Sequence, residues 1–182
     1  MSSYTAHTAQ QLMAIYNFKI SRARNNFLQY RKLVNPTLKI NWFGIELGNK
    51  LQQFVFDLEN GLKPMLIIEA PPQHGKSEAI CDLISWIAGR NPNLRTIYAS
   101  FSKRLGVRAN LKFQRLYSKK VYSDIFPETR INSKNVATGT SYLRNREILE
   151  YVDAEGYFKN TTVQGSITGE NLDLGVIDDP IK

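Results

Sequence analysis

Two short groups of residues in this chain have the types and spacing needed to bind phosphate and magnesium. The first is Ala-Pro-Pro-Gln-His-Gly-Lys-Ser-Glu at residues 70–78. Here the Lys76 ammonium would bind terminal phosphates, the Ser77 hydroxyl would ligate Mg²⁺, and Gly75 would let the main chain approach a phosphate closely. The residues predicted to bind a nucleotide are Gln73, His74, Gly75, Lys76, Ser77 and Glu78.

The second group is Asp178-Asp179-Pro180, directly after an apolar run at residues 172–177. Asp178 would hold the water shell of Mg²⁺, and Asp179 would orient an attacking water. Alone, this tripeptide forms only a turn in most proteins. About a hundred residues after Lys76, it is the second half expected of a P-loop NTPase.

Both groups depend on the elements around them. Residues 65–69 are mostly apolar and predict a buried strand, residues 78–88 predict a helix, and residues 172–177 predict the last strand. Strand, loop and helix in this order are what a phosphate-binding loop requires. The general pattern has glycine six positions before the lysine, where this chain has Ala70. The alternative is an ordinary strand-to-helix turn with Lys76 in solvent.

Periodicity predicts the other elements. We expect one or two helices over residues 8–33, a helix over 45–58 and a strand over 94–100. Residues 147–152 and 157–163 predict a hairpin, and residues 165–169 a flexible connection. Residues 1–60 would form a helical lead-in and 61–182 the core. Three aromatic residues before the loop could stack on an adenine ring, although core packing is the more frequent role of such residues: Phe27, Tyr30 and Trp42.

A helix predicted over residues 102–119 has a basic side, and no acidic residue occurs in residues 83–123. Like charges at helical spacing are destabilising unless they serve a partner. The stripe therefore predicts contact with DNA or with the nucleotide of a neighbouring subunit, against the alternative of a solvated face. Its cations are Arg104, Arg108, Lys112, Arg115 and Lys119.

Composition sets the broad class. The chain has 182 residues, 42% of them hydrophobic, which is enough for one domain with a core. Its net charge of +8 indicates a polyanionic partner, although a merely soluble basic protein is the alternative. Cys81 is the only cysteine, so no intrachain disulfide forms, and neither a membrane span nor a signal-peptide pattern is present. These features predict a soluble, non-secreted protein.

The chain resembles the ATPase domain of the large terminase subunit of tailed bacteriophages. The likeness lies in the Pro-Pro-x-His-Gly-Lys-Ser loop, in residues 161–169 and in residues 173–180, and it extends from about residue 26 to the end. The resemblance implies an α/β P-loop NTPase of the additional-strand, conserved-carboxylate type, with a mostly parallel central sheet flanked by helices. It also implies ATP and Mg²⁺ as cofactors, Lys76 and Asp179 as catalytic residues, and Ser77 and Asp178 at the metal.

The same resemblance implies an ATP hydrolase that drives double-stranded DNA into a procapsid without reading its sequence. Its expected partners are further copies in a ring, the portal and the small terminase subunit, in the cytoplasm of the bacterial host and transiently at the procapsid portal. Two departures are visible: Gln73 stands where the family commonly has arginine, and Asp179 replaces the usual glutamate. A finger arginine acting in trans would come from elsewhere, and the candidates are Arg104, Arg108, Arg144 and Arg146.

The strands expected after Asp179, the coupling segment and the nuclease domain of the family are missing from this sequence, which predicts a truncated product or fragment. Two other functions therefore stay open. One is a catalytically incomplete module that binds nucleotide, DNA or partner subunits. The other is a helicase-type motor core, which would need a second motor domain that this length cannot hold.

Overall fold

The computed structural model describes residues 2–139, 141–165 and 169–180, with side chains from residue 8 onward. The chain divides into two compact units, residues 1–67 and residues 68–182, whereas the sequence analysis placed the boundary after residue 60. Among the described helices, none combines the length and the apolar character needed to cross a membrane.

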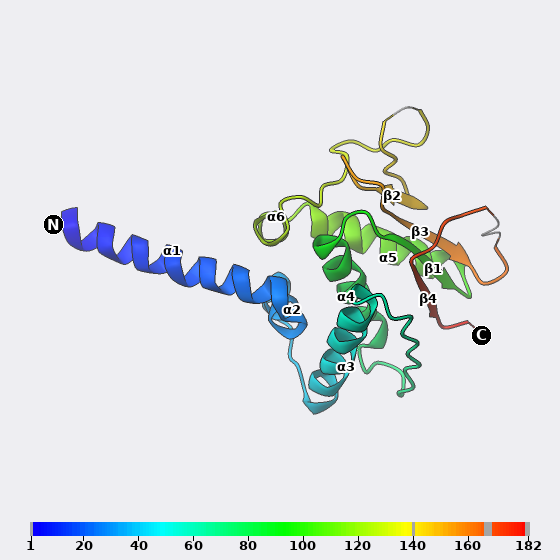
Figure 1. The fold of residues 1–182 in the computed structure, drawn as a ribbon, viewed down its shortest axis with the longest axis horizontal. Coiled ribbons are helices and arrows are strands. Elements are labelled where there is room, and N and C mark those ends of the chain that lie inside the picture. The colour runs from blue at the N-terminus through cyan, green and yellow to red at the C-terminus, as the bar shows by residue number, and fades with distance from the viewer. Residues whose placement is uncertain (1, 140, 166–168, 181–182) are drawn as a thin grey trace. The chain divides into compact units, whose positions relative to one another are not determined.

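The first unit is helical, with α1 (Ser2–Asn25), α2 (Phe27–Val34) and α3 (Trp42–Glu59) (Figure 1). Asparagine side chains begin two of these helices: Asn26 accepts a hydrogen bond from Gln29 N, and Asn41 accepts one from Gly44 N, each at 2.9 Å. Because Gly48 has no side chain, Leu28 of α2 packs directly on α3. The one or two helices predicted over residues 8–33 are observed as α1 and α2, and the helix predicted over residues 45–58 is observed as α3.

The second unit is an α/β structure with a four-stranded sheet in the order β2-β3-β1-β4. Its central strand β1 (Arg95–Ser100) pairs in parallel with β3 (Tyr157–Thr162) and β4 (Leu174–Asp178), while β2 (Ile148–Glu150) pairs antiparallel with β3. The sheet is therefore mostly parallel, as predicted. The strand over 94–100, the hairpin and the last strand are confirmed, with β2 shorter than expected.

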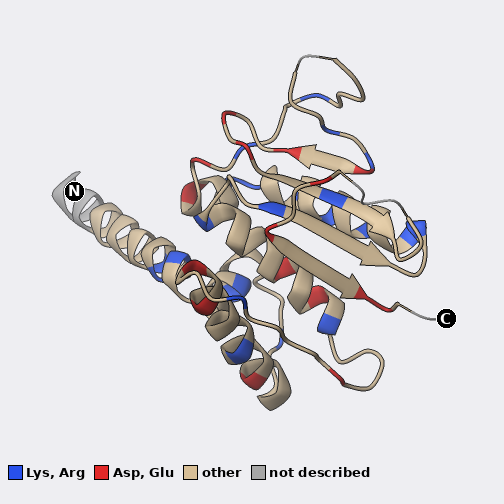
Figure 2. Cartoon of the chain, turned by 45° about the vertical axis from the view of Figure 1, so that its right-hand side comes forward, with Lys and Arg blue, Asp and Glu red and all other residues tan. Residues whose placement is uncertain are grey.

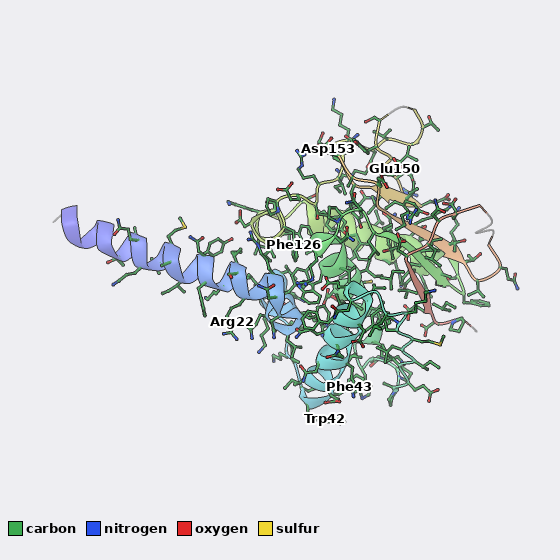
Figure 3. All side chains as sticks on the ribbon, viewed as in Figure 1. Arg22, Trp42, Phe43, Phe126, Glu150 and Asp153 are labelled. Atoms are coloured by element: carbon green, nitrogen blue, oxygen red, sulfur yellow. The ribbon has the colours of Figure 1, made fainter. Side chains whose placement is uncertain are left out.

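Helices of the second unit are α4 (Lys76–Arg90), α5 (Lys103–Tyr117) and α6 (Lys120–Ile125). Helix α5 packs on β1 and β3, where the rings of Phe113 and Phe158 meet edge to face at 4.5 Å. Phe126, labelled in Figure 3, follows α6 and packs over Gly89 of α4. Helices α4 and α5 confirm the two helices predicted for this region, but α6 was not predicted.

The prediction of a strand over residues 65–69 is wrong. No strand forms between residues 62 and 71, and the side chains of Met65 and Ile67 are 90% and 80% exposed. A strand is stabilised by hydrogen bonds to a neighbour, and none of the four described strands pairs with this segment. The predicted connection at residues 165–169 lies largely outside the described residues, because 166–168 are not described.

Candidate functional site

The loop before α4 has the backbone of an anion-binding turn. Gly75 is the N-cap of α4 and has a left-handed φ of 75°, and Gln73, two residues earlier, has φ 64°. No side chain caps this end of the helix. Since the first N–H groups of a helix have no acceptor within it, the beginning of α4 presents donors and the positive end of the helix dipole.

Lys76 lies inside this turn. Its side chain is half-buried, and its ammonium donates a hydrogen bond to the Ala70 carbonyl. His74 is exposed, and its Nδ1 lies 3.0 Å from the Pro72 carbonyl oxygen. The Lys76 amine therefore lies against the main chain of its own loop, where the sequence analysis expected phosphate.

Ser77 and Asp178 meet although they lie 101 residues apart in the sequence. The Ser77 hydroxyl donates to Asp178 Oδ1 at 3.1 Å. Asp178 is the last residue of β4, and Ser77 lies in the first turn of α4. The structure thus brings together the two residues that the sequence analysis assigned to Mg²⁺.

Tyr98 makes the second contact to this carboxylate, and the sequence analysis missed it. Its hydroxyl donates to Asp178 Oδ2 at 2.5 Å. In the β1–β4 register, Ser100 is opposite Asp178 and Tyr98 is opposite Val176. Side chains two residues apart on a strand share a face, so Tyr98 is the diagonal neighbour of Asp178. The alternation within the predicted strand could have placed Tyr98 and Ser100 on one face. It could not have shown that this face lies beside Asp178, because that depends on the β1–β4 register.

Asp179 follows at the tip of β4. It is exposed, its φ is 46°, and its carbonyl accepts a hydrogen bond from Phe101 N at 3.1 Å. Three non-glycine residues have positive φ among the described residues, and two of them, Gln73 and Asp179, lie in this candidate site. Such backbone conformations persist where the surroundings hold them, and functional sites are a frequent place for them.

The oxygen ligands present at this site fit an Mg²⁺ ion that is bound together with a nucleotide. In the part of the chain that is described, no three His, Cys, Asp or Glu side chains form a metal-binding group. Mg²⁺ in nucleotide sites takes one or two protein oxygens and completes its shell with phosphate and water. The Ser77 hydroxyl and the Asp178 carboxylate supply that kind of incomplete oxygen set.

Comparison of the chain with family models, curated proteins and solved structures gave no match in any of the three. The geometry and chemistry of the residues therefore carry the functional argument.

The predicted basic stripe of α5 is divided between two environments. Arg104, Arg108 and Arg115 are exposed, as are Lys119 and Lys120 just after the helix. Figure 2 marks the positions of lysine and arginine along the chain in blue. Lys112 instead contacts α4: its Nζ lies 2.7 Å from Glu78 Oε1 and 3.0 Å from Asp82 Oδ1. The expectation that no carboxylate compensates this stripe is therefore wrong at Lys112.

The other two candidate arginines also differ in their surroundings. Arg144 donates to Gln114 Oε1 at 3.2 Å and to the carbonyls of Asn132 and Ser133 at 2.6 and 3.0 Å. Its guanidinium therefore stabilises a loop within its own unit. Arg146 is exposed, and its carbonyl accepts a hydrogen bond from Asn160.

The aromatic candidates for adenine stacking belong to the first unit. Phe27 and Tyr30 are fully buried in its core, which confirms the alternative reading of both as packing residues. Trp42 is 79% exposed at the beginning of α3, where its ring meets Phe43 edge to face at 6.1 Å (Figure 3).

Proposed function

We propose that this chain binds ATP with Mg²⁺ at the loop preceding α4 and hydrolyses it, as the motor domain of a phage DNA-packaging terminase. The observation that carries the proposal is the 3.1 Å contact between Ser77 of the loop and Asp178 at the tip of β4. A P-loop NTPase needs a loop hydroxyl and a strand-tip carboxylate at one magnesium ion. The mostly parallel sheet and the uncapped helix N-terminus agree with this assignment, whereas the strand expected before such a loop does not form at residues 65–69.

Each residue would contribute binding or positioning. The N–H groups at the start of α4 would hold phosphate oxygens, and the Lys76 ammonium would leave the Ala70 carbonyl to contact the terminal phosphates. Ser77 and Asp178 would hold the metal and its water shell, and Asp179 would orient the attacking water. Bound Mg²⁺ would neutralise charge that develops on the phosphates. The products would be ADP and phosphate.

The exposed arginines of α5 support contact with a polyanion. Arg104, Arg108 and Arg115 follow each other at helical spacing on α5, and the sequence contains no base-reading motif. Contacts of this kind go to phosphates and are independent of sequence. The partners in this proposal are double-stranded DNA, further copies of the chain in a ring, a portal and a small terminase subunit, in the bacterial cytoplasm.

Nucleotide binding provides the first test. We expect a labelled ATP to bind the wild-type chain with Mg²⁺, and Lys76→Ala to weaken this binding strongly. Lys134→Ala removes the same charge from an exposed loop position and is the matched control. Equal binding by Lys76→Ala and the wild type would refute the nucleotide site.

A second candidate function is a module that binds DNA or partner subunits and does not turn over nucleotide. The exposed arginines of α5 favour this alternative, because they do not depend on the loop. Steady-state phosphate release distinguishes the two functions. Release that disappears in Asp178→Asn supports the ATPase, and no release from the wild type, with or without DNA, supports the module.

A further inference from the structure

The Asp178 carboxylate is held from two sides by two different hydroxyl groups. Ser77 donates to Oδ1 at 3.1 Å, and Tyr98 donates to Oδ2 at 2.5 Å. A carboxylate at the end of a side chain turns about a broad torsion unless its oxygens are fixed. The Tyr98 bond occupies one oxygen and so fixes the direction in which the other one points.

Tyr98 is well suited to hold this position. Its side chain is 2% exposed in the central strand β1, and its ring packs against Phe158 with centroids 6.1 Å apart. A tyrosine hydroxyl is protonated at neutral pH, because its ordinary pKa is about 10, so Tyr98 is the donor in this hydrogen bond. A rigid ring that ends in a donor sets the place of its acceptor.

The hydrogen-bond acceptor of the Tyr98 hydroxyl distinguishes this residue from a tyrosine that only fills the core. Tyr122 is also fully buried in the same unit, and its hydroxyl donates to the Ser85 carbonyl within α4 at 2.8 Å. Tyr98 instead directs its hydroxyl to a carboxylate at the strand tip, beside the loop. A phenyl ring would fill the core equally well, so packing does not explain the Tyr98 hydroxyl.

We infer that Tyr98 is a positioning residue for the magnesium nucleotide site: its hydroxyl fixes Asp178 Oδ2, so that Oδ1 faces the Ser77 hydroxyl. This inference rests on the proposed function, because it concerns the same site. The ligand class is a nucleoside triphosphate bound with a divalent cation. Tyr98 acts through Asp178 and need not contact the nucleotide.

The test measures how nucleotide binding depends on magnesium. A fluorescent ATP analogue is titrated with MgCl₂ in the presence of wild type, Tyr98→Phe or the control Tyr122→Phe. We expect Tyr98→Phe to raise the Mg²⁺ concentration at half-maximal effect by about 10-fold, the size of one lost hydrogen bond to a charged group. Binding measured in EDTA should be the same in Tyr98→Phe as in the wild type. Tyr122→Phe should leave the Mg²⁺ dependence unchanged even if it lowers the melting temperature.

A double-mutant cycle shows whether Tyr98 acts through Asp178. In the Asp178→Asn background, Tyr98→Phe should have no further effect on the Mg²⁺ dependence, because the partner carboxylate is already altered. Additive effects of the two changes would overturn the inference, as would a Tyr98→Phe titration identical to the wild type while the wild type still binds. If the wild type shows no magnesium-dependent binding at all, the proposed function fails as well, so the two failures are distinguishable.

Discussion

Substitution of Lys112 tests which basic residues of α5 stabilise the fold and which are available to a binding partner. The sequence places this lysine in the same basic stripe as Arg108, but the structure pairs it with Glu78 and Asp82 of α4. The Asp82 side chain is only 4% exposed, whereas Arg108 is exposed. We therefore predict that Lys112→Met destabilises the fold and that Arg108→Met does not, although both remove one positive charge.

The magnitude follows from the burial of the partner. Removing one member of a buried ion pair leaves an uncompensated charge and costs about 3 to 5 kcal/mol. The Lys112 side chain is itself 28% exposed, so solvent reaches part of this pair and the lower end applies, about 3 kcal/mol. For a unit of this size, that loss lowers the melting temperature by about 10 °C.

The pKa of Lys112 agrees with this role. Burial lowers the pKa of the ammonium, but Asp82 and Glu78 more than offset this, and the pKa lies above its ordinary value of 10.5. The folded protein therefore binds this proton more tightly than the unfolded chain. The stability from the pair is present below pH 10.5 and is lost as the pH rises above it.

Thermal unfolding followed by circular dichroism, together with DNA binding at several salt concentrations, provides the assay. Lys112→Met should melt at a lower temperature than Arg108→Met, while Arg108→Met should bind DNA more weakly than Lys112→Met. Adding Asp82→Leu to Lys112→Met should recover most of the lost stability, because no buried charge is left without a partner. Equal melting temperatures for the two single variants would refute a stabilising ion pair between Lys112 of α5 and the carboxylates of α4.

Three further predictions follow from individual residues. Burial raises the pKa of the Cys81 thiol to about 12, so a thiol reagent near neutral pH should react with Cys81 only after the protein unfolds. In the unfolded chain the thiol ionises near pH 9.0, so the free energy of unfolding should fall above that pH, and Cys81→Ala should reduce this fall. The hydrogen bond from Arg95 holds the pKa of Asp173 below its ordinary value of 3.8, so Asp173→Asn should melt at a lower temperature than wild type at neutral pH, with the difference vanishing as the pH falls below 3.8. Charge reversal in Arg108→Glu should weaken binding to duplex DNA and reduce the slope of its salt dependence, whereas an unchanged slope would exclude a phosphate contact at Arg108.

Local sequence patterns predicted the helices and paired strands of this fold well. The helix after the loop follows from its apolar spacing. β1 and β3 follow from β-branched and aromatic residues between turns, and β4 follows from its apolar run. The apolar run at residues 65–69 has the same local pattern but forms no strand. Apolar character alone does not provide a neighbouring strand, so this pattern could not decide the outcome.

Contacts between distant segments explain what the sequence could not predict at the candidate site. The Gly-Lys-Ser loop is visible locally, because glycine and the following helix set its backbone. The Tyr98 contact depends instead on which residue of β1 lies opposite which residue of β4. The pairing of Lys112 with Asp82 depends likewise on how α5 packs on α4. Neither arrangement has a signal in the spacing of residues along one segment.

The pairing register between β1 and β4 decides on which face of the sheet Asp178 lies. At the beginning of both strands, the Arg95 guanidinium donates to both oxygens of Asp173, at 2.7 and 2.9 Å, and Arg95 N donates to Asp173 Oδ2 at 2.9 Å. A bidentate pair of this kind fixes relative position as well as contributing energy. A slip of one residue would turn Asp178 to the opposite face of the sheet, away from Ser77 and Tyr98. The pair that holds the start of the strands therefore also determines where the carboxylate at their far end points.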